Sequence, residues 1–189
     1  MREWNQKRGT MYHYDHQTKV YDLQYLEEQD AKIEAALSSI EFGLNEVVLD
    51  MGCGTGFLFH HINKTTKRLV GLDISLKLLR EARKRTKHLS NISLIRADAD
   101  NTPFQDHIFN KIFATTLLQN MPDPTKTISE MRRIGKPEAI FVVTGLKKKF
   151  TSESYSTLLK KAQLKISILQ TNQHLKDYIA ICTNLKQSM

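Results

Sequence analysis

Apolar and polar residues alternate along the chain in blocks that predict strands and helices in turn. Short apolar runs are typical of strands buried on both faces, and the stretches between them carry apolar residues at helical spacing. The predicted strands cover residues 46–51, 68–74, 92–98, 111–119, 139–146, 165–171 and 177–184. The predicted helices cover residues 57–63, 75–89, 124–133 and 152–164.

This alternation predicts an α/β fold in which helices cover both faces of a mostly parallel sheet. Only five residues, 172–176, join the last two predicted strands. Because so short a connection cannot cross over a sheet, these two strands are expected to pair antiparallel. The sequence therefore predicts seven strands, the last of them antiparallel to its neighbours.

Composition adds limits to this picture. The chain has 189 residues, 40% hydrophobic and 25% charged, which favours one soluble globular domain. No apolar run approaches the roughly 20 residues of a membrane span, and residues 1–19 lack the apolar core of a secretory signal. Cys53 and Cys182 alone build neither a disulfide framework nor a zinc site, so no metal is expected. A cytoplasmic location is the default expectation.

The charge is unevenly placed. The net charge is +8, yet residues 1–45 carry 8 acidic and 5 basic groups, whereas the rest carries 12 acidic and 23 basic groups. A basic body of this kind favours an anionic partner, with nucleic acid first. Solubility alone explains the same charge equally well, so both interpretations stay open.

The stretch LDMGCGTGFL places a glycine-rich turn directly after the first predicted strand. Ligands of open α/β sheets bind beyond the carboxyl ends of the strands, where glycines allow close approach to the backbone. The spacing is G-x-G-x-G, because Phe57 stands where a dinucleotide fingerprint needs its third glycine. Asp50 beside the turn would repel a pyrophosphate and suits a cationic ligand.

Two more carboxylates follow the next two predicted strands. Asp73 ends the second strand, where an acidic side chain can accept hydrogen bonds from both hydroxyls of a ribose. Asp98 ends the third, where it can accept from an adenine amino group. Together with Asp50, they fit a ligand that has an adenosine, a cationic amino-acid part and no phosphate. That ligand is S-adenosylmethionine.

Four segments in order carry a family resemblance: VVLDMGCGTGFL, GLDIS, ADADNTPF and FNKIFATTLLQNMPDP. They resemble the motifs of class I S-adenosylmethionine-dependent methyltransferases, and most closely the group that carries D-x-G-C-G-T-G. The resemblance covers residues 46–146, and the ending is also similar to that fold. It implies a Rossmann-like sheet of strand order 3-2-1-4-5-7-6 with an antiparallel last strand.

The resemblance also implies which residues contact the cofactor. The glycines approach its methionine part with Asp50 beside the ammonium, Asp73 binds the ribose, and the residues after the fourth strand lie near the sulfonium. Cys53 is then a small residue of the turn and not a nucleophile. The implied cofactor-binding residues are Asp50, Gly52, Cys53, Gly54, Gly56, Asp73, Ile74, Asp98, Ala99, Thr115 and Leu117.

Some substrates are disfavoured by what the fourth motif lacks. Adenine-N6 and glutamine-N5 methyltransferases usually carry [DN]-P-P-[YF] there, but this chain reads TTLL at residues 115–118. Cytosine-C5 methylation needs a cysteine nucleophile, and Cys53 and Cys182 lie in the wrong elements. Exposed nitrogen, oxygen and carboxylate nucleophiles remain. Methyl transfer depends mainly on proximity and alignment, so a catalytic triad is not required.

Residues 1–45 are interpreted as a segment that covers the cofactor and substrate, attached to a methyltransferase core of residues 46–189. Four of the six tyrosines lie in the first 25 residues. Tyr14, Tyr21 and Thr116 are the candidates for contacts near the methyl group. Each ring taken singly is explained as well by packing against the sheet, and an aromatic cover could also stack a base.

Basic side chains suggest where a substrate would bind. The basic face of the helix at residues 75–89 is interpreted as a solvated face. Lys147, Lys148 and Lys149 follow the fifth strand near the rim of the site, so they are interpreted as substrate-binding. The leading hypothesis is methylation of RNA, either tRNA or rRNA. The alternatives are methylation of a protein or small molecule, and a catalytically silent regulatory subunit of the same fold.

A partner is also implied by the resemblance. Some methyltransferases of this fold lack a recognition domain, as this chain does, and rely on a small zinc-binding activator that pairs along the third strand. Here that strand is an edge in which Ile92, Leu94 and Ile95 are expected to be exposed. An uncovered edge of this kind would invite aggregation, so a binding partner is expected there.

Overall fold

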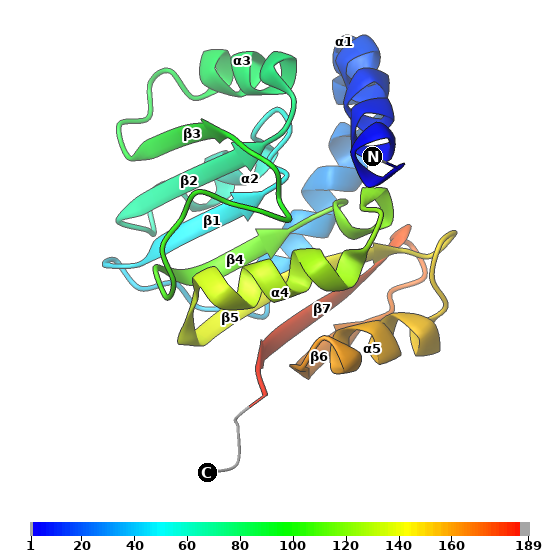
Figure 1. Ribbon diagram of the computed structural model, residues 1–189. Coiled ribbons are helices and arrows are strands. Elements are labelled where there is room, and N and C mark those ends of the chain that lie inside the picture. Colours follow the sequence, from blue (N-terminus) through cyan, green and yellow to red (C-terminus); the bar gives the residue numbers. More distant parts are fainter. Residues whose placement is uncertain (1, 186–189) are drawn as a thin grey trace.

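The structure is a computed structural model that describes residues 2–185, with the side chains of residues 3–15 and 27–185. A seven-stranded sheet forms its centre, with helices packed around it (Figure 1). The strands are β1 (Val47–Met51), β2 (Arg68–Asp73), β3 (Ile92–Arg96), β4 (Phe109–Ala114), β5 (Gly135–Leu146), β6 (Leu164–Gln170) and β7 (Asp177–Asn184). The helices are α1 (Arg2–Leu37), α2 (Phe57–Ile62), α3 (Leu76–Arg85), α4 (Pro124–Ile134), α5 (Ser152–Lys161) and the short 3₁₀ helix η1 (Leu118–Asn120).

The strand order is β3-β2-β1-β4-β5-β7-β6. The first five strands pair parallel, and β7 pairs antiparallel with both β5 and β6. The predicted seven-stranded, mostly parallel Rossmann-like fold with an antiparallel last strand is therefore confirmed. None of the helices within residues 2–185 is long and apolar enough to cross a membrane.

Helices cover both faces of the sheet because each face presents apolar side chains. Tyr155 of α5 and Met131 of α4 are fully buried on one face. Ile33 of α1, Phe59 of α2 and Leu79 of α3 are buried on the other. The strands lie between these two apolar layers, which explains why they are continuous apolar runs in the sequence.

Strand β4 ends five residues earlier than the sequence predicted. The prediction continued to residue 119 because Leu117 and Leu118 extend the apolar run, but the backbone leaves the sheet after Ala114. Thr116 has a positive φ of 57°, which no strand residue adopts, and η1 follows at once. Leu118 is still fully buried, but it packs from η1 and not from a strand.

Strand β3 is an edge strand, as predicted, but its apolar residues are less exposed than expected. The predicted exposure of Ile92 is wrong, since only 8% of this residue is accessible and it packs in the cluster with Leu69 and Leu79. Leu94 and Ile95 are half-buried. The edge therefore offers its backbone and a partly covered apolar row to solvent.

Helix α1 determines where the site can form. Figure 1 shows it at the side of the sheet toward which the arrows of β1, β2 and β3 point. Its last turns pack Ile33 and Ala36 into the core, and its first turns reach past the strand ends. The space between α1 and the carboxyl ends of the strands is where ligands of α/β sheets bind.

Candidate functional site

A cleft that is partly open to solvent lies between α1 and the carboxyl ends of the parallel strands. Tyr14 and Thr116, two of the predicted catalytic candidates, line it together with most of the predicted cofactor residues. Gly56 lies in the same turn but not on the cleft wall. The predicted cofactor residues on the wall are Asp50, Gly52, Cys53, Gly54, Asp73, Ile74, Asp98, Ala99, Thr115 and Leu117.

The glycine turn owes its shape to backbone conformations that side chains rarely adopt. Gly52, Gly54 and Gly56 all have positive φ, at 78°, 54° and 83°. A Cβ on Gly54 would meet nothing within 4 Å, because this residue faces the open cleft. The turn is held to β2 by the amides of Gly52 and Cys53, which donate to the Leu72 carbonyl at 2.7 and 3.0 Å. Backbone is thus exposed at the cleft wall with space above it for a ligand.

Asp50 is the most unusual side chain of the cleft. It is 3% exposed, and its Oδ1 has no hydrogen-bond partner among the residues that the structure describes. Burial, assisted by the nearby Asp73 carboxylate, raises the pKa of Asp50 to about 7. A buried carboxylate oxygen without a partner is costly. A ligand ammonium at this point would supply the missing partner, so the residue fits the cationic end of S-adenosylmethionine.

Asp73 is held rigidly at the end of β2. One carboxylate oxygen accepts from the Gly54 amide at 2.9 Å and the other from the Ser75 amide at 2.8 Å. Burial raises the pKa of Asp73, and these backbone hydrogen bonds oppose that rise. A carboxylate offers about four acceptor positions, so capacity for two ribose hydroxyls remains.

An ion-pair cluster closes the cleft beyond the end of β3, and sequence reasoning missed it. The Lys7 ammonium on α1 lies 2.7 and 2.8 Å from the two carboxylate oxygens of Asp98 and 2.6 Å from Asp100. Burial lowers the pKa of Lys7, but the hydrogen bonds to Asp100 and Asp98 outweigh it, and the pKa is raised overall. The residues are 91 positions apart, so no local pattern pairs them.

A second buried group lies beside the cleft just after the end of β4. Thr116 Oγ1 accepts from Lys32 Nζ at 2.9 Å and from Gln29 Nε2 at 3.4 Å, and its amide donates to Thr144 Oγ1 at 2.8 Å. Lys32 is paired with Asp177 at 2.6 Å, and both side chains are 2% exposed. A β-branched residue at positive φ is strained, and strain of this kind gathers at functional sites. Lys32 and Gln29 were not predicted from sequence.

Further contacts fix the first turns of α1 over the cleft. The hydroxyl of Tyr14 accepts a hydrogen bond from Asn120 Nδ2 at 3.0 Å. The Ser75 hydroxyl donates to the carboxylate of Asp15. The side chain of Tyr21, the remaining catalytic candidate, lies outside the described residues. Tyr14 and Thr116 are therefore the two candidates that the structure brings to one cleft.

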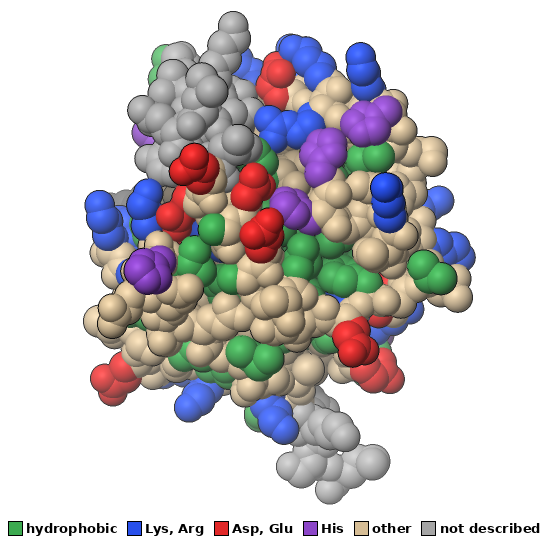
Figure 2. All heavy atoms as spheres, turned by 180° about the vertical axis from the view of Figure 1, so that it is seen from behind, with side chains coloured by type: hydrophobic (Ala, Val, Ile, Leu, Met, Phe, Trp, Pro, Cys, Tyr) green, Lys and Arg blue, Asp and Glu red, His purple; other side chains and the backbone are tan. Residues whose placement is uncertain are grey.

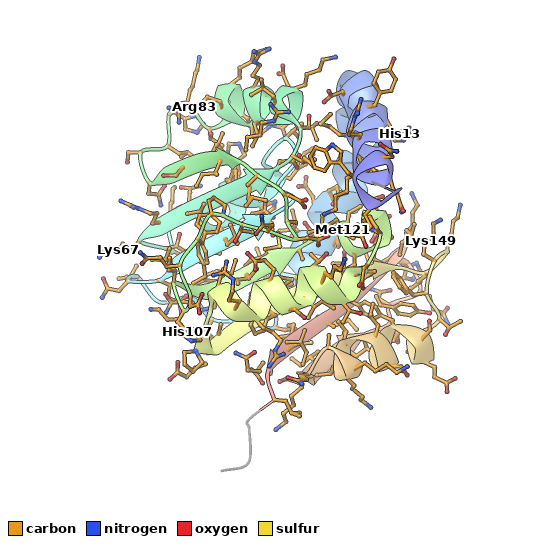
Figure 3. The ribbon with its side chains drawn as sticks, in the orientation of Figure 1. His13, Lys67, Arg83, His107, Met121 and Lys149 are labelled. Carbon is orange, nitrogen blue, oxygen red and sulfur yellow. The ribbon has the colours of Figure 1, made fainter. Side chains whose placement is uncertain are left out.

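The predicted substrate-binding lysines lie outside the cleft wall. Lys147 donates to the carbonyls of Asn172 and Leu175 at 2.5 and 2.7 Å, so its ammonium holds the β6–β7 loop. Lys148 and Lys149 are exposed. Figure 3 places Lys149 toward the same end of the sheet as Met121, which lines the cleft.

Neither cysteine is a candidate nucleophile. Both are free and buried. Burial, with the nearby Asp73 and Asp50 carboxylates, raises the pKa of Cys53 well above its usual value, and burial raises that of Cys182 to about 12. Thiols of this kind stay protonated and unreactive. Within the described part of the chain, no group of three His, Cys, Asp or Glu side chains could hold a metal ion.

Comparison with known proteins agrees with this geometry. The methyltransferase domain family matches residues 44–183. A demethylmenaquinone methyltransferase of Staphylococcus haemolyticus is 35% identical over 97 residues, which cover 50% of this chain and 41% of that protein. A malonyl-(acyl-carrier protein) O-methyltransferase of Marinomonas sp. is 29% identical over 182 residues, which cover 92% of this chain and 62% of that protein. The chain spans about half the length of the curated relatives it matches.

The same fold occurs in a solved complex between the Haloferax volcanii Trm112 methyltransferase activator and a methyltransferase. The TM-score is 0.80 at 16% identity, with 92% of this chain and 98% of that chain covered.

Fold and cleft together define a Rossmann-like α/β protein of the class I type, with its cleft at the carboxyl ends of the parallel strands. More specifically, the chain belongs to the methyltransferase domain family. Membership of this family implies S-adenosylmethionine as the cofactor.

Proposed function

We propose that this chain catalyses methyl transfer from S-adenosylmethionine to RNA, as a member of the D-x-G-C-G-T-G group. The observation that carries the methyl-transfer part is the buried Asp50 oxygen, which has no hydrogen-bond partner in the described part of the chain, beside the open backbone of Gly54. A ligand with an ammonium group on an extended chain would pair with the Asp50 oxygen and occupy the space above Gly54. The cofactor, when bound, supplies an electrophilic methyl group on a sulfonium.

The residues of the chain then bind and align. Asp50 holds the ammonium, Asp73 the ribose hydroxyls, and Asp98 the adenine edge beside Lys7. Thr116 and Tyr14 stand at the methyl-transfer end and orient the nucleophile. In this proposal residues 1–45 form the cover of the site and residues 46–189 its core, so that α1 excludes water from the reacting atoms.

RNA is proposed as the substrate class because of charge. Beyond residue 45 the chain carries 23 basic against 12 acidic groups. Lys148 and Lys149 are exposed, and Figure 3 shows Lys149 toward the cleft end of the sheet. Phosphate contacts from such side chains supply most of the affinity in RNA binding. The proposal includes action in the cytoplasm, where tRNA and rRNA are available.

A second candidate is methylation of a carboxylate on a small molecule or carrier protein. The observation that favours it is the similarity to the malonyl-(acyl-carrier protein) O-methyltransferase, which extends over 92% of this chain. Thr116 also suits this chemistry, since Lys32 and Gln29 donate to its oxygen and leave its own proton for an acceptor such as a carboxylate.

We further propose that a small zinc-binding activator covers β3. Support comes from the edge position of β3, from its half-buried Leu94 and Ile95, and from the Haloferax neighbour that was solved with the Trm112 activator. Purification of the chain with and without a candidate activator tests this. A chain that is soluble, monomeric and fully active alone would remove the need for a partner.

The deciding experiment incubates the protein with cofactor labelled at its methyl group and with separate RNA, protein and metabolite fractions. Label in the RNA fraction is the expected result, and Asp73→Ala, which should bind the cofactor more weakly, should transfer less label at the same cofactor concentration. Label only in the protein or metabolite fraction would support the second candidate. Cofactor binding without label in any fraction, with the activator present, would indicate a catalytically silent regulatory subunit.

A further inference from the structure

An exposed aromatic stripe follows the first turns of α1. Trp4, Arg8 and Tyr12 recur every four residues and so share one flank of the helix. Trp4 is 51% exposed and Tyr12 66%, although large aromatic side chains usually bury most of their surface. Arg8 between them is also exposed. The stripe therefore has a composition typical of surfaces on which bases stack.

The direction of the stripe follows from the helix period. Asp15 comes eleven residues after Trp4, which is close to three full turns, so both lie on the same flank. The carboxylate of Asp15 accepts a hydrogen bond from the hydroxyl of Ser75, the residue just before α3. The flank that carries Trp4 therefore faces the α3 side of the molecule. Lys7 and Met11 on the neighbouring flank line the cleft.

Helix α3 presents a basic wall beside this stripe. Leu78, Leu79 and Ala82 are buried against the sheet, so the opposite face of the helix is turned to solvent. That face begins with Leu76, which is 42% exposed. The exposed basic side chains that follow in α3 and the turn after it are Lys77, Arg80, Arg83, Lys84 and Lys87. Figure 1 shows α1 and α3 side by side, and Figure 3 shows Arg83 pointing outward from α3.

Acidic side chains gather elsewhere on α1. Glu27, Glu28 and Glu34 border a depression that shares no residue with the cleft. Figure 2 shows a group of carboxylates on the rear face, with basic side chains spread around it. An anionic polymer would be repelled by Glu27, Glu28 and Glu34 and attracted to the basic face of α3.

We infer that the surface formed by Trp4, Arg8 and Tyr12 of α1 and the basic face of α3 binds a single-stranded segment of RNA. Bases stack on the two rings, while the α3 side chains and Arg8 contact the phosphates. Duplex RNA does not fit this surface, because its bases are already stacked on each other. The inference rests on RNA as the proposed substrate and places the strand beside the mouth of the cleft.

The single tryptophan of the chain makes the surface directly observable. Because Trp4 is the only tryptophan, fluorescence excited at wavelengths that tyrosine does not absorb reports on the stripe alone. Titration of the protein, saturated with S-adenosylhomocysteine, with a single-stranded oligouridylate of about twelve nucleotides should quench this fluorescence. A duplex of the same length should quench it much less.

Variants are compared by the anisotropy of the labelled oligonucleotide across a salt series. Trp4→Leu should weaken binding by about tenfold, the scale expected when one base no longer stacks on a ring, and Trp4→Phe should restore most of the affinity. Lys77→Gln with Arg80→Gln should reduce the salt slope by about 0.7 for each phosphate that is no longer neutralised. The matched control is Lys160→Gln with Lys161→Gln, two exposed lysines of α5, which should change nothing.

Two results would overturn the inference. One is that the Trp4→Leu and Lys77→Gln/Arg80→Gln variants both bind the oligonucleotide with the affinity and the salt slope of the wild type. The other is equal quenching and affinity with poly-glutamate, which would indicate an acidic polypeptide. Cofactor affinity, measured in the same samples, separates this test from the proposed function. If the protein methylates RNA but the variants bind the oligonucleotide as the wild type does, the proposed binding surface is wrong and the proposed function still holds.

Discussion

At the scale of single residues, Asp50 has opposite effects on folding and on ligand binding. Its carboxyl group is 3% exposed, and burial raises its pKa to about 7. The folded chain therefore binds a proton at Asp50 between about pH 4 and pH 7 that the unfolded chain does not. This group's contribution to stability falls as pH rises through that window, whereas the ionised form is the one that binds an ammonium.

The first prediction follows for cofactor affinity. In the wild type, affinity for S-adenosylmethionine should fall below pH 7, by up to about tenfold per pH unit, because protonated Asp50 cannot pair with the ammonium. Asp50→Asn should bind weakly at every pH and lose this dependence. Calorimetric titrations between pH 5.5 and 7.5 measure both. An equal pH slope in the two proteins would assign the effect to another group.

The second prediction concerns the same substitution without cofactor. At pH 8, Asp50→Asn should raise the free energy of unfolding, by at most about 4 kcal/mol, since the cost of the buried charge is removed. At pH 5 the difference should shrink, because Asp50 is then protonated in the folded wild type. Urea unfolding at the two pH values provides the test. If Asp50→Asn is less stable than the wild type at pH 8, the folded protein compensates the buried charge of Asp50.

At the scale of elements, the structure depends on how α1 attaches to the sheet. Lys32 and Asp177 form an ion pair between α1 and β7 in which both side chains are 2% exposed. The pair also fixes Thr116, since Lys32 donates to its hydroxyl. At the other end of α1, Lys126 and Glu3 form a pair that is about half exposed. Pairs so different in burial should differ in their effect on stability.

The third prediction uses this contrast. Lys32→Met leaves Asp177 charged and buried, so it should lower the free energy of unfolding by about 3–5 kcal/mol. Adding Asp177→Leu should recover most of the loss. Lys126→Met should leave stability unchanged within error. Chemical denaturation of the four proteins measures this, and a double variant as unstable as Lys32→Met would argue against the ion pair as the cause.

Elements were predictable where one local pattern fixed them. The helix predicted over residues 75–89 begins where expected, and the Ser75 hydroxyl caps α3 by accepting a hydrogen bond from the Leu78 amide. The end of β4 was not predictable from the sequence. Leu117 and Leu118 continue the apolar pattern of the strand, and the residue with positive φ is Thr116, where a glycine would have indicated a turn.

The site was predictable on one side only. Its sheet side follows from motifs at the ends of β1, β2 and β3, and the cleft brings these residues together. Its α1 side depends on Lys7, Gln29 and Lys32, which lie in a polar stretch without a clear apolar stripe. They acquire roles only through partners between 84 and 145 positions away, and no sequence pattern records such a distance.

At the scale of the whole molecule, charge and shape divide the surface. The cleft and Lys149 lie toward one end of the sheet, and Glu27, Glu28 and Glu34 of α1 border a separate depression. A bulky anionic substrate would therefore approach from the cleft end.

The fourth prediction tests that approach. Lys148→Ala with Lys149→Ala should weaken RNA binding and reduce its salt slope by up to about 0.7 for each phosphate left without a lysine, with cofactor affinity unchanged. Lys147→Ala is a separate case, because its ammonium holds the Asn172 and Leu175 carbonyls, so it should lower stability instead. RNA binding across a salt series, beside thermal unfolding, distinguishes the two. Identical slopes in wild type and double variant would mean that these lysines touch no phosphate.

The central claim is that the cleft binds S-adenosylmethionine through the carboxylates at the strand ends. Calorimetric titration of the cofactor into wild type and Asp73→Ala tests it most directly. The account predicts one site per chain in the wild type and binding that is weaker by about 1–3 kcal/mol in the variant, the cost of unpaired hydroxyls at a buried site. No heat with the wild type, or equal affinity in the two proteins, would contradict it.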